Sequence, residues 1–175
     1  MSQPPPPFAE LLAQCSTSAM HLETRDAYAI GEEDQDLTAW RAGVLAAVED
    51  RASWWGPFHD AVAEAVSRGV IVQRARVVSL PPTEYVRFEH ACTPRNLAAG
   101  EEVRWLRRDQ ALGLLLPAHD FWIFDDKLVR WHHFGGNGAH LRDEVDECPV
   151  SAERAGRAFA AVWSRAVPHG EFILG

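Results

Sequence analysis

The sequence has few cysteines and no long apolar run, and each shortage excludes a class of protein. Its 175 residues include three cysteines, Cys15, Cys92 and Cys148, with no Cys-x-x-Cys pair, so we expect no disulfide framework and a reduced, cytoplasmic protein. No apolar stretch reaches the roughly 18 residues that a membrane helix needs, because Gly113 and Pro117 interrupt the longest one. The first residues lack a basic segment followed by an apolar one, so we expect no signal peptide.

Positive charge is also scarce. Lys and Arg number 17 against 25 Asp and Glu, which gives a formal net charge of -8. Such a chain lacks the basic footprint that binding to a phosphate backbone requires, so we expect no direct binding to nucleic acid. By contrast, a hydrophobic content of 47% with seven tryptophans excludes a disordered chain and predicts a packed core. The length fits one domain.

Hydrophobic periodicity and turn signals predict a single α/β domain, a mixed sheet flanked by helices, over residues 8–175. Residues 1–7 hold four consecutive prolines and are expected to be a frayed tail. Helices are expected to start at Phe8, after Asp36, at Pro57, after Thr83 and after Ser151. Strands are expected at 18–24, 69–78, 102–106 and in a hairpin over 120–134. The acidic segment 31–34 is interpreted as a solvated loop, and Pro94 as the start of a separate turn.

One segment carries a motif. His119 is followed seven residues later by Asp126, and the glycine-rich segment 135–137 comes next. This pattern resembles the phospholipase D signature His-x-Lys-x-x-x-x-Asp, and the helix–Gly–strand segment 58–72 and the segment 100–104 resemble further parts of that superfamily. The resemblance covers about residues 54–140 and implies one half of the phospholipase-D-like fold.

The lysine position of that signature holds Phe121. In the superfamily, the His attacks the phosphoryl group, the Lys holds its oxygens and the Asp supports a His. A phenyl ring cannot donate a hydrogen bond or carry charge, and losing one such contact lowers the rate by about 10²–10³. Two motifs make one active site in the superfamily, so activity would require a symmetric dimer with His119 and Asp126 as its catalytic residues. We predict that catalysis is lost.

The terminal thirds resemble a narrower family. The segments 8–12, 22–28 and 40–43, together with the aromatic hairpin and the last helix, are similar to an uncharacterised actinobacterial domain family. Its members are often encoded beside helix-turn-helix regulators and small partner proteins. The resemblance implies a regulatory or accessory role and a protein partner, either such a transcriptional regulator or its companion.

Seven of the 17 basic residues lie between Arg74 and Arg108. One hypothesis is an exposed surface for an anion or an acidic partner, with tryptophans as interface anchors. The alternative is a solvated face neutralised by nearby glutamates such as Glu89 and Glu101, with the tryptophans in the core. The candidate surface residues are Arg74, Arg76, Arg104, Arg107, Trp54 and Trp131.

Histidines late in the chain raise the question of a metal. His132, His133, His140 and Cys148 lack both an i, i+4 histidine pair and a Cys-x-x-Cys arm. His132 and His133 also point to opposite faces of a strand. We therefore expect no metal and no cofactor.

The sequence thus predicts a non-catalytic, phospholipase-D-like domain that binds a protein partner. Two alternatives remain open. One is a homodimeric phosphodiesterase or nuclease, and the other is a sensor of a phosphate or nucleotide ligand.

Overall fold

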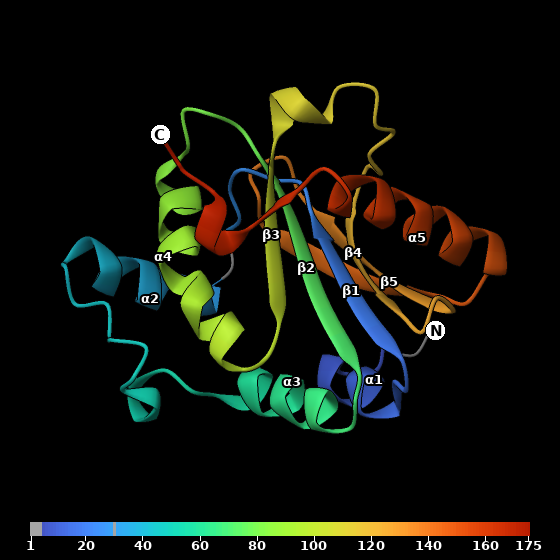
Figure 1. Cartoon of the computed structure of the whole chain (residues 1–175), viewed down its shortest axis with the longest axis horizontal. Helices are drawn as coiled ribbons and strands as arrows, with labels where there is room; N and C mark the ends of the chain where they lie inside the picture. Colours follow the sequence, from blue (N-terminus) through green and yellow to red (C-terminus); the bar gives the residue numbers. More distant parts are fainter. Residues whose placement is uncertain (1–4, 30) are drawn as a thin grey trace.

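A seven-stranded mixed sheet organises the computed structural model, which describes residues 5–29 and 31–175 (Figure 1). The strand order is β6-β5-β4-β1-β2-β3-β7. Strands β1, β2 and β3 are parallel, and the others run antiparallel to their neighbours. The strands are β1 (Ser18–Glu23), β2 (Ile71–Val78), β3 (Glu102–Arg107), β4 (Asp120–Phe124), β5 (Leu128–Phe134), β6 (His140–Asp146) and β7 (Val167–Pro168). The mixed α/β fold expected from the sequence is confirmed.

Helices cover both faces of this sheet (Figure 1). One face packs against α5, and the other packs against α1, α3 and α4, while α2 lies outside α4 and contacts it through Trp40 and Phe88. The helices are α1 (Phe8–Gln14), α2 (Gly31–Arg41), α3 (Pro57–Ser67), α4 (Glu84–Ala98) and α5 (Pro149–Trp163). Among the described residues, no helix has both the length and the apolar character needed to cross a membrane.

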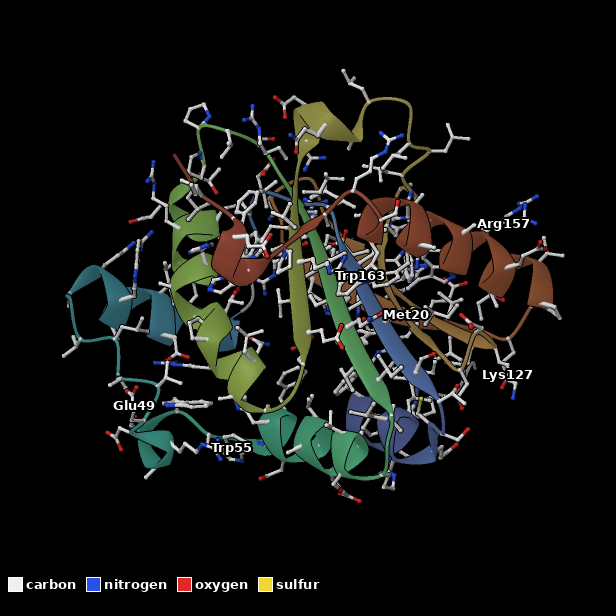
Figure 2. The ribbon with its side chains drawn as sticks, in the orientation of Figure 1. Met20, Glu49, Trp55, Lys127, Arg157 and Trp163 are labelled. Carbon is white, nitrogen blue, oxygen red and sulfur yellow. The ribbon has the colours of Figure 1, made fainter. Side chains whose placement is uncertain are left out.

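The α5 face is apolar. Ala155, Phe159 and Val162 form the buried stripe expected for the last helix, and they pack against the inward residues of the central strands, such as Leu22 and Phe121. Figure 2 shows the amphipathic arrangement, with Trp163 turned toward the sheet and Arg157 pointing away from it. This face supplies the larger continuous apolar cluster of the domain.

Local signals account for the α3–β2 unit. Pro57 begins α3, and Gly69, with φ 90°, follows its end in the left-handed conformation that glycine favours. The β4–β5 hairpin turns at Asp125 and Asp126, whose φ values of 50° and 55° match a type I′ turn that acidic and amide residues tolerate. Both elements confirm the sequence prediction.

Two helix predictions were wrong. The segment 31–34 belongs to α2 instead of a loop, and α2 ends at Arg41. Pro94 lies inside α4 and does not begin a separate turn. Burial of Phe88 and Thr93 on the same helix holds it together, because tertiary packing outweighs the preference of one residue.

Two edge strands were not predicted. Strand β6 is polar and largely exposed, so it lacks the alternation of apolar residues that reveals a half-buried strand. Strand β7 has two residues and ends in Pro168, a residue tolerated on sheet edges. Of the predicted tail, residues 1–4 lie outside the described residues, and the Pro6 carbonyl accepts a hydrogen bond from Arg130 Nη1 at 3.3 Å.

Candidate functional site

Ionisable side chains occupy the sheet face opposite α5. Strands β1 and β2 are in register, with His21 beside Arg74 and Glu23 beside Arg76. The two-residue period of a strand sends all four side chains to the same face. Each of these arginines is only 7% exposed, so the face forms part of the protein interior.

Every one of these charges has an opposite charge against it. Glu23 Oε1 accepts a hydrogen bond from Arg74 Nη1 at 2.8 Å, and its Oε2 accepts one from Arg76 Nε at 2.6 Å. Arg74 Nε also donates to Glu101 Oε1 at 2.8 Å, and Arg76 forms a close ion pair with Glu89 of α4. Such pairing is required, because an unpaired buried charge is strongly destabilising. We call these five residues the ionic cluster.

Protonation follows this pairing. Burial acts to raise the pKa of Glu23, but Arg74 and Arg76 outweigh it and hold that pKa well below its usual value. Burial raises the pKa of Glu89 despite the neighbouring Arg76. The carboxylate shared by two arginines is therefore the fixed negative centre of the cluster.

A narrow pocket opens beside the ionic cluster. Its interior is small, about 10 Å³, which is roughly the space that one water molecule needs. Next to it, Asp120 accepts hydrogen bonds from the Thr24 backbone N–H at 2.8 Å and from the Tyr28 hydroxyl. Burial raises the pKa of both Asp120 and Tyr28. The lining residues include Glu23, Arg25, Tyr28, Arg76, Tyr85, Glu89 and Trp105.

Unsatisfied polar atoms concentrate on the same face. Within the described part of the chain, six buried side-chain atoms have no hydrogen-bond partner, and one of them, His90 Nε2, belongs to α4, which covers this face. The other five are His21 Nδ1, Arg25 Nε, Arg76 Nη1, Arg130 Nε and His132 Nε2. Buried polar groups are nearly always satisfied in folded proteins, so this face has unused capacity to bind polar groups.

The prediction that Arg74 and Arg76 lie on an exposed surface is wrong. Arg74 and Arg76 are buried and ion-paired, so they form neither an exposed anion site nor a solvated face. The reason is that α3 and α4 cover the face on which they lie. Glu89 and Glu101 do neutralise them, but inside the protein. Arg104 lies on the other face, 4.4 Å above the Trp163 ring.

The remaining surface candidates are dispersed. Arg107, half exposed, pairs with Asp109 two residues away. Trp54 is half-buried and contacts Trp55 and His59. Trp131 lies on the α5 face, with its ring centroid 5.2 Å from that of Phe121. The six residues therefore do not form one continuous surface.

The candidate catalytic residues are also separated. His119 precedes β4 and its ring contacts that of His133 at a tilt of 49°, with 4.4 Å between ring centroids, whereas Asp126 follows β4 at its other end. They therefore flank a five-residue strand without meeting.

Asp125, the residue before Asp126, connects the β4–β5 turn to the start of β1. The Asp125 carboxylate accepts hydrogen bonds from the backbone N–H groups of Ser16, Thr17 and Ser18 at 2.7–3.1 Å, which fixes the hairpin turn to the start of β1. Counting back from Asp125, the expected signature would place Asp120 at the lysine position and Ala118 at the histidine position. Neither register brings a histidine and a lysine together.

The sequence interpretation missed several residues of this face. Asp120, Glu23 and Asp143 were not singled out, because acidic side chains usually mark solvated surface. One signal was available: Glu23 lies in the strand predicted over 18–24, on the same side as Ala19, at a spacing that turns it inward. Residues on other elements that contact these acidic side chains could not be identified from the spacing within one strand.

Comparison with solved structures places this sheet in a known fold. Nuc from Salmonella typhimurium, a phospholipase D family member, aligns over 91% of this chain and 86% of its own, with 12% identity and a TM-score of 0.50. NucT from Helicobacter pylori aligns over 91% and 87% at 12% identity, with a TM-score of 0.49. The archaeal chromatin protein TrmBL2, which has a novel mode of DNA binding, aligns over 90% of this chain at 12% identity and a TM-score of 0.47, and this chain spans 47% of its length. These likenesses concern the fold alone.

The sequence comparison identifies the family directly. No curated protein matches the chain. A protein-family model does match, and it spans residues 6–174, nearly the whole sequence. The chain thus has the phospholipase-D-like fold and belongs to the DUF6879 family, a domain of unknown function.

Proposed function

We propose that this chain is a non-catalytic, phospholipase-D-like domain that recognises a protein partner in a regulatory or accessory role. The absence of a His–Lys pair around β4 and the separation of His119 from Asp126 favour binding over phosphodiester cleavage, in a monomer or a dimer. The observation that carries the proposal is an exposed leucine loop, residues 112–116, between β3 and β4.

This loop presents apolar side chains from a fixed backbone. Leu112 is 79% exposed and Leu115 is 95% exposed, while Leu114 and Leu116 pack against the α5-face core. Arg165 Nη1 donates hydrogen bonds to the backbone carbonyls of Gln110 at 3.2 Å and Leu112 at 3.1 Å. Single exposed leucines are ordinary, but neighbouring ones held from below form a prepared contact patch.

The place of the loop in the fold supports the same role. It follows a 3₁₀ turn that begins at the carboxyl end of β3 and lies at the top of Figure 1. In open α/β sheets, recognition commonly occurs beyond the carboxyl ends of parallel strands. The resemblance to domains encoded beside helix-turn-helix regulators makes such a transcriptional regulator, or its companion, the proposed partner.

A photocrosslinking amino acid at position 115, introduced in the native host, tests the proposal. We expect a discrete adduct that mass spectrometry identifies as a helix-turn-helix protein or a protein encoded beside one. Unlabelled wild-type protein should suppress this adduct, and the L112S variant should suppress it less. A crosslinker at Val150, which is 52% exposed on α5, is the matched control. Equal labelling from positions 115 and 150 would contradict the proposal.

A second candidate function is sensing of a phosphate or nucleotide ligand, favoured by the unpaired Arg25 Nε and Arg76 Nη1 atoms beside the pocket. Inorganic phosphate and nucleotides should then raise the melting temperature of the wild type. The R25Q variant should lose this rise, whereas the exposed-site variant R157Q should keep it. No ligand-dependent shift in the wild type would exclude this candidate.

A further inference from the structure

We propose that His132, His140 and Asp143 bind a first-row divalent transition-metal ion such as Zn²⁺. His132 of β5 lies directly across from Asp143 of β6 in the sheet register. His132 Nδ1 is 2.6 Å and His140 Nε2 is 2.8 Å from the same atom, Asp143 Oδ1. The three candidate ligand atoms all lie within 4.8 Å of one another.

A backbone irregularity brings these residues together. His140 and Asp143 are three positions apart, so a regular strand would turn them to opposite faces. The register shifts between His133 and Phe134: Phe134 pairs with His140, and His133 pairs with Arg142. Leu141 is the extra residue and is 66% exposed. Bulges of this kind commonly redirect a side chain next to a functional site.

The donor set fits the proposed ions. Two imidazole nitrogens and one carboxylate oxygen suit Zn²⁺ and its first-row neighbours, and three protein ligands leave a position for water. Metal–ligand bonds of about 2.0–2.1 Å imply ligand separations of about 3.3 Å in a tetrahedral site. An ion would therefore replace the two His–Asp hydrogen bonds and move these atoms apart by roughly half an ångström. The His140 side chain, 39% exposed, has room for this movement.

Neighbouring groups orient the ligands. Arg130 Nη2 donates to Asp143 Oδ2 at 2.6 Å, which fixes the carboxylate and leaves Oδ1 directed at the histidines. Such outer contacts are typical of metal sites. The other ring nitrogen of His132, Nε2, is buried without a partner, and the His21 ring centroid lies 5.5 Å from that of His132. The positive charge of Arg130 opposes the ion, so we expect moderate affinity.

Titration of the full chain with Co²⁺, a spectroscopic substitute for Zn²⁺, tests the site. We expect one equivalent to bind with visible d–d absorption, and Zn²⁺ to displace it and raise the melting temperature. H140A and D143N should weaken binding by at least about tenfold. H133A is the matched control, because His133 lies on the opposite face and contacts Glu144. C148S controls for the exposed thiol.

Two results would overturn the proposal. A wild-type protein that shows neither saturable Co²⁺ binding nor a Zn²⁺-dependent rise in melting temperature holds only a hydrogen-bonded His–Asp–His triad. Unchanged Co²⁺ affinity in both H140A and D143N would place the ion elsewhere. Because the His140 side chain is partly exposed, H140A is expected to fold, and its circular dichroism spectrum checks this.

Discussion

The two faces of the central sheet differ in how they are filled. Under α5 the strands present Leu22, Ala75, Val77 and Phe121, which are almost fully buried. On the opposite face, residues one position away along the same strands are charged, as in the ionic cluster. Apolar contacts are non-directional, so the α5 face tolerates small shifts, whereas each buried charge on the other face requires a placed partner.

This difference indicates that the two faces have different roles, one in stability and the other in binding. Among the residues that the structure describes, the α5 face buries apolar surface and leaves no buried side-chain polar atom without a hydrogen-bond partner. The ionic face, in the described ranges 5–29 and 31–175, holds five buried side-chain atoms without hydrogen-bond partners and borders the pocket. A chain selected for stability alone would fill that face with apolar side chains, since well-packed apolar residues often match or exceed a buried ion pair. We therefore assign a structural role to the α5 face, and the proposed metal site and the candidate phosphate site lie on the ionic face, whereas the leucine loop lies beyond the end of β3.

The largest effect is expected from F159A. Phe159 is 2% exposed and packs within the α5-face cluster, and removing a buried phenyl ring lowers the free energy of unfolding by about 3–5 kcal/mol. Urea denaturation measures this change. A loss below about 1 kcal/mol would show that the α5 face is not the main apolar core.

The E23Q variant tests the ionic face. The amide keeps the shape of Glu23 but leaves two buried arginines sharing one fewer negative charge, so we expect a loss of about 3 kcal/mol, at the lower end for a broken buried pair. Urea denaturation again measures it, with E102Q as the control because Glu102 is exposed. A neutral outcome would mean that water or a ligand already screens the cluster.

The D125N variant tests the polar connection between the hairpin turn and β1. Replacing the charged acceptor of three backbone N–H groups should remove about 2 kcal/mol at neutral pH. Burial acts to raise the Asp125 pKa, but hydrogen bonds from Cys15, Thr17 and the backbone lower it overall.

The stability that Asp125 contributes depends on pH, and the lowered pKa sets the direction of this dependence. Because the folded-state pKa is lowered, the contribution of Asp125 is complete above its unfolded value, about 3.9. It is lost as the pH falls from there toward the folded-state pKa. The stability difference between wild type and D125N should therefore shrink between about pH 5 and pH 3 in urea titrations. A constant difference would exclude the carboxylate as its source.

The smallest effect is expected from R157A. Its ion pair with Glu153 joins side chains that are 80% and 59% exposed, and exposed pairs contribute about 0–1 kcal/mol. Thermal unfolding should show almost no change. A large loss would mean that this surface of α5 makes contacts in an assembly, which gel filtration would detect.

Local sequence signals were sufficient where one residue determines the backbone. Pro57 and Gly69 mark α3, two aspartates mark the hairpin turn, and the spacing of Ala155, Phe159 and Val162 marks α5. They failed at β6, which is a polar edge strand, and at Pro94, where packing of α4 overrides a helix-breaking residue. The site shows the same limit: the two-residue period of a strand puts Arg74 and Arg76 on one face, but it does not indicate that helices cover that face.

The sequence by itself determined the mixed α/β architecture, the shared strand face of Arg74 and Arg76, and the missing lysine at Phe121. Those properties depend on neighbours within a few positions. The tertiary structure decided that the arginines are buried, that Glu23, Glu89 and Glu101 are their partners, and that a bulge joins His140 to His132 and Asp143. These contacts join residues as many as 53 positions apart in the sequence. Strand pairing and the packing of helices on the sheet bring them together.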